Sequence, residues 1–152
     1  MIILRRYTPA DLEAVLALFY ETVHTVNARD YAPAQLDAWA PRQPDRAAWA
    51  ARLAAEHVLL AEEGSTLLGF ASLDPARGLL DHLYVHHAHQ RCGIATRLCE
   101  ALAPLAETPV LRAEVSQTAT PFFAARGWRV VRRQEVVRDG ARLENMVMEK
   151  RL

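Results

Sequence analysis

The segment that most constrains the fold runs from residue 79 to residue 115, where a strand, a helix and a second strand follow one another. An apolar run, Leu79–Val85, follows Gly78 and has the length of a buried strand. A helical period then extends from about Gly93 to Ala106, and Pro109–Val115 is a second apolar run. Two strands that are joined through a helix lie parallel in one sheet. The segment therefore predicts a βαβ unit.

Hairpin signals flank this unit on both sides. Glu63-Gly64 separates strand-like runs at 57–62 and 65–73, and Asp139-Gly140 separates runs at 128–137 and 142–148. Because hairpins pair their strands antiparallel, we expect a mixed α/β domain, covering residues 1–152, whose sheet is antiparallel at both ends. The remaining expected elements are a strand at Ile2–Arg5 and helices over Pro9–Thr25, Tyr31–Trp39, Asp45–Glu56 and Thr118–Arg126.

Composition limits the class of partner. The chain has 18 Lys and Arg residues against 18 Asp and Glu residues, which disfavours a nucleic-acid binder. From Arg126 onward there are eight basic and four acidic residues, a local charge of +4, which suits an anionic small ligand or, alternatively, a solvated strand face. No signal peptide and no apolar run of about 18 residues is recognisable, so we expect a soluble, cytoplasmic protein without a membrane partner.

The cysteines and histidines do not favour a disulfide or a metal site. Cys92 and Cys99 lie seven residues apart in one expected helix, about 10 Å from each other, which is too far for a disulfide. His82 and His86 share an expected strand face but lie about 13 Å apart, too far to bind one zinc ion. His86, His87 and His89 are expected in a solvated loop, so no metal site is predicted.

Small residues open the central helix at a position suited to an anion. The N-terminus of a helix presents backbone N–H groups without intrahelical partners and a partial positive charge. Gly93 and Ala95 would let a phosphate approach that backbone, and Arg91 and Arg97 add charge. The stretch lacks the Gly-Lys-Ser/Thr ending of a P-loop and has too few glycines for a dinucleotide fingerprint. An ordinary helix start is the alternative.

The residues Gln90-Arg91-Cys92-Gly93-Ile94-Ala95 resemble the Gln/Arg-x-x-Gly-x-Gly/Ala signature of the GNAT superfamily of acetyl-CoA-dependent N-acetyltransferases. Leu83-Tyr84-Val85 before the signature and Ala119–Trp128 after it extend the resemblance, and the order of elements agrees over nearly the whole chain. One bacterial subgroup of small acetyltransferases has similar segments, which are here Asp30-Tyr31, Gln35–Pro41 and Met146–Lys150. The resemblance implies an α/β fold of the α+β type, with a mostly antiparallel central sheet, a splayed parallel pair and helices on both faces.

The resemblance also implies where acetyl-CoA binds. Its pyrophosphate would be held by the backbone of the signature, and its pantetheine arm would lie between the strand at 79–85 and Glu114-Val115-Ser116. Phe122 and Phe123 would border the arm. The cofactor-binding residues expected on this basis are Leu83, Tyr84, Val85, Gln90, Arg91, Cys92, Gly93, Ile94, Ala95, Thr96, Phe123 and Arg126.

Acetyl transfer to an amine needs a base, because an alkylamine with a pKa near 10 is mostly protonated at neutral pH. Strand alternation would place Asp81 on one face with Leu79, Leu83 and Val85, so Asp81 is the first candidate, and Glu114 and His82 follow. A strand-end aspartate that binds a loop amide is the alternative reading of Asp81. The resemblance implies that a backbone N–H near 83–85 polarises the thioester carbonyl.

The acid for the leaving thiolate is a departure from the family pattern. Phe123 stands where many members have a tyrosine, which leaves Ser116, Tyr84, Tyr31 or water to supply the proton. The resemblance also implies that the first two helices and the last hairpin form the acceptor site. The candidates in the first region are Tyr20, His24, Asn27, Tyr31 and Trp39, although a core position is the favoured reading of Trp39 and Trp49.

The function that the resemblance implies is transfer of an acetyl group from acetyl-CoA to a primary amine, by direct attack in a ternary complex. A small molecule is the expected acceptor, ahead of a peptide or protein. A catalytically weak CoA-binding sensor or interaction domain is the alternative, and Phe123 keeps it open. Members of the family are often dimers, so a homodimer agrees with the resemblance.

Overall fold

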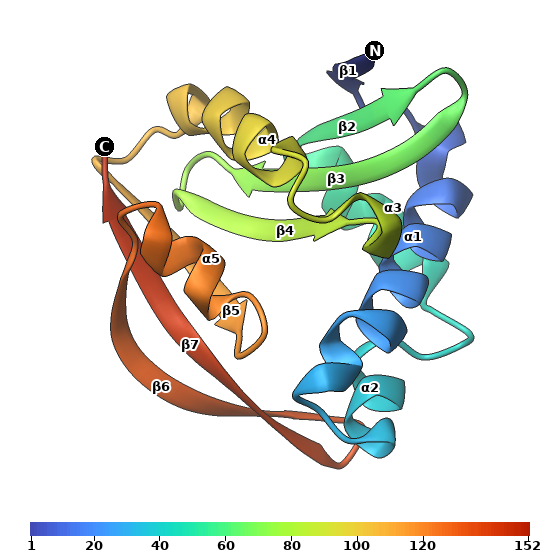
Figure 1. The fold of residues 1–152 in the computed structure, drawn as a ribbon, viewed down its shortest axis with the longest axis vertical. Coiled ribbons are helices and arrows are strands. Elements are labelled where there is room, and N and C mark those ends of the chain that lie inside the picture. Colours follow the sequence, from blue (N-terminus) through green and yellow to red (C-terminus); the bar gives the residue numbers. More distant parts are fainter.

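The computed structural model describes all residues, 1–152, and contains one seven-stranded sheet with the order β1-β2-β3-β4-β5-β7-β6 (Figure 1). Every neighbouring pair is antiparallel except β4 and β5, which are parallel. The expected fold class is thus confirmed. The strands are β1 (Ile2–Arg6), β2 (His57–Glu63), β3 (Thr66–Asp74), β4 (Leu79–Val85), β5 (Val110–Ser116), β6 (Arg129–Arg138) and β7 (Ala141–Arg151).

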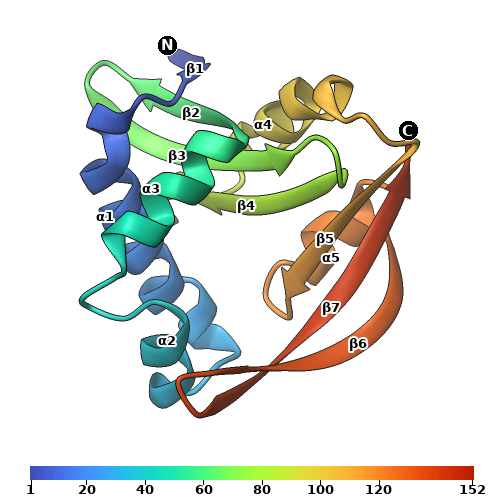
Figure 2. The ribbon, with the colours of Figure 1, turned by 180° about the vertical axis from the view of Figure 1, so that it is seen from behind.

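Helices cover both faces of the sheet. The N-terminal helices α1 (Leu12–Thr25), α2 (Pro33–Trp39) and α3 (Arg46–Ala55) lie on one face, which Figure 2 shows from the front. The later helices α4 (Ile94–Leu102) and α5 (Thr120–Ala125) lie on the other face (Figure 1). Each face has its own apolar core, one built around α1 and one around α4. No helix is long and apolar enough to cross a membrane.

Local sequence signals explain where the N-terminal helices begin. The Asp45 carboxylate accepts a hydrogen bond from the backbone N–H of Ala48 at 3.0 Å and so caps α3. The Asp11 carboxylate accepts one from the backbone N–H of Thr8 at 2.8 Å, just before α1, while Arg5 binds both of its oxygens. Both starts agree with the sequence prediction, because capping depends on residues within three positions of each other.

The parallel strands β4 and β5 touch only at one end. Their single registered pair is Leu79 with Arg112, and the backbone N–H of Arg112 donates to the carbonyl of Gly78 at 2.8 Å. Gly78 has a φ of +62°, and a Cβ there would lie 2.7 Å from the Val110 carbonyl oxygen and even closer to the Thr108 hydroxyl. Beyond this joint the strands diverge, so the sheet divides into a β1–β4 half and a β5–β7 half (Figure 1).

Strand β4 does not alternate regularly, which corrects one sequence prediction. Ser72 of β3 pairs with His82, but the next residue of β3, Leu73, pairs with Leu80, so Asp81 is an extra residue in a β-bulge. Leu80 belongs to the core on the α4 face, whereas His82 packs against aromatic rings on the opposite face. The expectation that Asp81 shares one face with Leu83 and Val85 is therefore wrong, because alternation from sequence assumes a strand without a bulge.

Candidate active site

A cavity of about 720 Å³ opens where β4 and β5 diverge. Its walls are the second half of β4, the end of β5, the loop before α4 and the exposed side of α5. All the expected cofactor-binding residues except Cys92 line it: Leu83, Tyr84, Val85, Gln90, Arg91, Gly93, Ile94, Ala95, Thr96, Phe123 and Arg126. Cys92 is exposed. A cavity with these walls has room for a long ligand that reaches from the loop before α4 to β5.

The loop before α4 presents a continuous series of free backbone donors. No backbone N–H from Gln90 to Thr96 donates to another group of the protein, and the first donor that does is Arg97, which bonds to the Gly93 carbonyl at 3.0 Å. Arg91 has a φ of +61° and Gly93 a φ of +79°, and residues of left-handed conformation within such a turn are typical of backbone concavities that bind anions. The Gln90 side chain fixes this loop by donating to the Val85 carbonyl at 2.5 Å. Such a concave set of amides at a helix N-terminus binds phosphate groups.

The opposite end of the cavity is an unpaired strand edge. The backbone N–H of His86 bonds to the Leu68 carbonyl of β3, and in an antiparallel pair alternate residues bond to the same neighbour. The backbone groups of Tyr84 therefore face β3, while those of Leu83 and Val85 face the cavity. An extended ligand can pair with this edge as an added strand would.

Of the arginines near the larger cavity, some line it and one points away from it. The Arg126 guanidinium donates to the Thr96 hydroxyl at 2.8 Å and stacks 3.7 Å above the Phe122 ring, at the mouth of the cavity. The Arg97 side chain turns away and donates to the Ile2 carbonyl, so its predicted contribution to the anion site is wrong. Arg29, which the sequence did not single out, lines the cavity instead.

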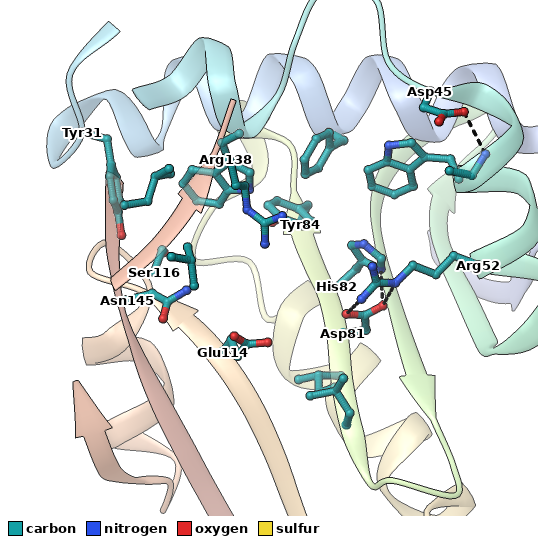
Figure 3. A pocket seen from close by; sticks show the side chains of 18 residues that line it. Tyr31, Asp45, Arg52, Asp81, His82, Tyr84, Glu114, Ser116, Arg138 and Asn145 are labelled. Carbon is teal, nitrogen blue, oxygen red and sulfur yellow. Dashed lines mark hydrogen bonds and ion pairs between the residues drawn. The ribbon is translucent and has the colours of Figure 1, made fainter. Parts of the chain in front are cut away.

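A second cavity, of about 360 Å³, lies on the α1 and α3 side of the same opening (Figure 3). Its walls combine aromatic side chains, among them Phe19 of α1 and Trp49 of α3, with charged and polar ones. The two cavities have a common boundary, made of Trp39, Leu80, Asp81, Tyr84, Glu114 and Ser116. Groups held in one cavity and groups held in the other would therefore meet beside the bulge of β4.

Comparison with known proteins identifies this arrangement. Residues 27–150 match the model of a family described as acetyltransferase (GNAT) domain. The chain belongs to the GNAT family. It is 32% identical over 145 residues to the uncharacterized N-acetyltransferase YafP of Escherichia coli (strain K12), covering 95% of this chain and 93% of that protein. Acetyl-CoA is the cofactor of this family of acetyltransferases.

Solved structures agree with the assignment. A GCN5-related N-acetyltransferase from Rhodopseudomonas palustris has a TM-score of 0.93 and 36% identity, covering 99% of this chain and 95% of that one. The PaiA N-acetyltransferase from Thermoplasma acidophilum, solved with coenzyme A, has a TM-score of 0.79 and 20% identity, covering 100% of this chain and 99% of that one. The second likeness concerns the fold alone.

In this GNAT chain, Asp81 lies at the boundary of the cavities as an ion-paired carboxylate. The Arg52 guanidinium of α3 donates to both of its oxygens, at 2.5 and 2.7 Å (Figure 3). Burial opposes ionisation of Asp81, but hydrogen bonds from Arg52 and Glu56 and the charge of Arg52 outweigh it and hold its pKa below the usual value. Glu114, the next candidate base, is exposed and accepts a hydrogen bond from Gln134 at 2.6 Å. Burial lowers the pKa of His82 to about 4, so His82 is neutral at physiological pH.

The candidate hydroxyls differ in what already binds them. The Ser116 hydroxyl oxygen accepts from the Asn27 amide at 3.3 Å and from the backbone N–H of Ala119 at 3.1 Å, which leaves its proton free to be donated at the common boundary. The Tyr31 hydroxyl donates to the Glu144 carbonyl at 2.6 Å and accepts from Gln117, so both of its roles are taken.

Two bulky aromatic residues lie near this boundary: Tyr84 lines both cavities, and Phe123 lines the larger one. Burial raises the pKa of the Tyr84 hydroxyl above its usual value. Phe123, at 4% exposure, packs edge-on against Trp128 and borders the larger cavity.

Only part of the predicted acceptor region surrounds the smaller cavity of this GNAT fold. Tyr31 and Trp39 line it, and Asn27 lines the larger one. Tyr20 and His24 line neither, because their rings stack on each other at 4.2 Å and His24 binds the Ala40 carbonyl. Functional candidates that the sequence did not indicate, or that it assigned equally to the core, are Phe19, Asp45, Trp49, Arg52, Arg138 and Asn145.

Arg138 has no distinguishing sequence signal, since it is one of several arginines on β6. Its guanidinium points into the smaller cavity, between the Tyr84 ring and Asn145 (Figure 3). It forms neither an ion pair nor a side-chain hydrogen bond within the protein, unlike Arg52. A free guanidinium in an aromatic-walled cavity can bind a carboxylate or another planar anion.

The histidines gather with carboxylates in two separate places. His86 and His87 approach Glu21 on the surface, at 3.3 and 2.9 Å, and His82 lies near Glu56 and Asp81 inside the protein. The sequence places His82 and His86 on one strand face. In the structure they belong to different clusters, His82 to the one with Glu56 and Asp81 and His86 to the one with Glu21. The expected lack of a metal site stays a prediction.

Proposed function

We propose that this acetyltransferase transfers the acetyl group of acetyl-CoA to a primary amine of a small molecule, by direct attack in a ternary complex within a single domain. The observation that carries the proposal is the common boundary of the two cavities, since both reactants can reach it from opposite sides without displacing each other. A covalent enzyme intermediate is unnecessary in such an arrangement.

The residues of the larger cavity fit acetyl-CoA. The free amides of 90–96 would hold the pyrophosphate, with Arg91 and Arg126 at the rim. The backbone of Leu83 and Val85 would pair with the pantetheine arm. Acetyl-CoA supplies an activated acyl group as a thioester, and the neutral net charge of the protein agrees with recognition by oriented amides in place of a basic field.

The residues at the boundary would divide the remaining work. The backbone N–H of Leu83 would stabilise negative charge on the thioester oxygen. Asp81 would accept a proton from the incoming amine, and Ser116 would donate one to the thiolate in the role that Phe123 is unable to fill. Glu114 is the alternative base on the facing strand.

The smaller cavity favours an amine with an apolar body and an anionic group. Its volume of about 360 Å³ suits a small molecule better than a folded protein surface. Aromatic walls would pack against the apolar body, and Arg138 would bind a carboxylate while the amine faces Asp81. Amino acids with large apolar side chains have this combination.

The test is thiol release from acetyl-CoA with matched pairs of amines. We expect L-phenylalanine to be acetylated with a higher kcat/KM than 2-phenylethylamine, which differs only by the carboxylate, and tryptophan to exceed tryptamine. Arg138→Gln should remove the preference. Preference for the amine without a carboxylate would contradict the role of Arg138. No thiol release with any primary amine, despite binding of acetyl-CoA, would favour the sensor alternative.

Two glycines provide a matched control for the cofactor site. Gly93 and Gly140 both have a φ of +79°, and a Cβ on either would meet no atom within 4 Å, so Gly93→Leu and Gly140→Leu carry similar backbone strain. Only Gly93→Leu should abolish thermal stabilisation by acetyl-CoA, because its side chain would fill the space over the free amides. Equal stabilisation of both variants would contradict the proposed phosphate site.

A further inference from the structure

We propose that Glu56 is a positioning residue for the general base: its buried carboxyl group shares one proton with Asp81, and the pair, not Asp81 alone, receives the proton of the acceptor amine. The base role rests on the proposed function, whereas the shared proton is a property of the protein by itself. Glu56 follows α3 directly and lines neither cavity, and no sequence motif includes it.

The geometry of the cluster favours a proton between the two carboxyl groups. The Glu56 side chain is 7% exposed and that of Asp81 is 10% exposed, and a carboxyl oxygen of each lies within 4.8 Å of the other. An ionised carboxylate has no donor, so two ionised groups would only repel each other. The Glu56 Oε1 atom is buried and receives no hydrogen bond from any donor of the protein. Protonation of one group turns the contact into a hydrogen bond.

The neighbours decide which group keeps the proton. Arg52 donates twice to Asp81, which favours the ionised form of Asp81 and leaves the proton on Glu56. His82 lies 3.6 Å from Asp81 and 4.0 Å from Glu56, but burial keeps it neutral, and its Nδ1 is engaged with the buried Ser72 hydroxyl at 2.7 Å. One arginine thus balances one carboxylate, and the cluster is neutral while the proton is present.

The pair is a stronger base than an ordinary carboxylate. Burial, with the adjacent Asp81 charge, raises the pKa of Glu56 to about 8, although Ser72 and Arg52 act in the opposite direction. Two carboxyl groups that share a proton titrate together, so the value belongs to the pair. A base whose pKa is close to the working pH removes a proton from an ammonium group far more readily than one near 4.

Each proton of the reaction has a donor and an acceptor. When the pair is fully ionised, an acceptor ammonium gives one proton to Asp81, and that proton is then shared with Glu56. The neutral amine forms a bond to the thioester carbon, the carbon–sulfur bond breaks, and the second N–H proton passes to the leaving thiolate. The pair then returns its proton to water. Glu56 touches neither reactant, since only Asp81 reaches the boundary of the cavities.

Nuclear magnetic resonance of the ¹³C-labelled carboxyl groups tests the shared proton without turnover. The glutamate signal that is lost in Glu56→Gln is that of Glu56, and we expect it to titrate with a midpoint near pH 8 in the parent protein. In Asp81→Asn the midpoint should fall by at least one pH unit, because the neighbouring charge is gone. A midpoint in the ordinary glutamate range in the parent would overturn the proposal, even if Asp81→Asn does not fold.

The pH dependence of kcat/KM tests the base role, with acetyl-CoA and the amine that gives the fastest thiol release. Glu56→Gln should lose the rise near pH 8 and lower kcat/KM at pH 8 by about a hundredfold. Stabilisation by acetyl-CoA should be unchanged, and the matched control Glu63→Gln, at the exposed end of β2, should behave as the parent. An unaltered profile in Glu56→Gln would overturn the base role. Titration near pH 8 in a protein without transferase activity would instead contradict the proposed function.

Discussion

Ser116 lies at the common boundary of the cavities, and its hydroxyl group accepts hydrogen bonds there without donating one. Asn27 and the backbone N–H of Ala119 both donate to its hydroxyl oxygen, so its proton is free for a group bound at the common boundary of the cavities. We predict that Ser116→Ala lowers kcat by about tenfold to a hundredfold, because a positioned acid is lost, while the Kd for acetyl-CoA stays the same. The measurement is steady-state kinetics together with calorimetric titration, and Ser65→Ala, in the exposed β2–β3 turn, is the control. Unchanged kcat would show that Ser116 is not the acid.

The stability of the protein should also report on Glu56. Because its pKa in the folded protein is raised from the usual 4.5 to about 8, the stability that its protonated form provides is complete below about pH 4.5 and is lost as the pH rises through about 8. A glutamine at this position stays neutral throughout. We therefore predict that the Tm of Glu56→Gln minus the Tm of the parent increases between pH 5 and pH 9, measured by scanning calorimetry. A constant difference would show that Glu56 has an ordinary pKa.

At the residue scale, the sequence predicts chemistry that depends on neighbours along the chain. The amide-rich turn at 90–96 follows from a glycine and a helix start, and the structure has free amides there. Glu56 and Arg138 give no such signal, because their environment is created by α3, β3 and β6, which lie far apart in the sequence. Tyr20 and His24 lie outside the cavities for a related reason, since helical position alone does not say which side of α1 borders them.

At the scale of elements, the joint between β4 and β5 determines where the active-site opening begins. Gly78 and Gly64 have the same φ of +62°, but a Cβ would collide with the Thr108 hydroxyl and the Val110 carbonyl at Gly78 and would meet nothing at Gly64. We predict that Gly64→Ala lowers the free energy of unfolding by about 1–2 kcal/mol, from the backbone conformation alone. Gly78→Ala should lower it by more, because the collision adds to the same backbone cost. Urea unfolding of both variants provides the comparison, and equal losses would contradict the close packing at this joint.

The elements themselves are largely predictable from the sequence, with one exception in β4. Both hairpins and the central βαβ unit follow from turn residues and periodicity, and the structure confirms them. The bulge at Asp81 is not predictable. It results from how β4 pairs with β3, and the residues of β4 have the same pattern as a strand without a bulge. The bulge turns Asp81 toward Arg52 and Glu56. It therefore explains both why the predicted strand face of Asp81 is wrong and why its two partners were not predicted.

At the scale of the molecule, the sheet consists of two halves joined by one pair of residues between β4 and β5. A ligand that pairs with the free edge of β4 and also touches β5 would connect the halves. We therefore predict that acetyl-CoA at a hundred times its Kd stabilises the protein by about 2.7 kcal/mol, which corresponds to a Tm increase of about 5–10 °C. Amide hydrogen exchange should slow in β4 and β5 but not in β1, because the ligand restricts separation of the halves there. Gly140→Leu should respond to acetyl-CoA as the parent does, while Gly93→Leu should not. Uniform slowing of amide exchange over the whole protein, or no slowing at millimolar acetyl-CoA, would contradict binding across the joint.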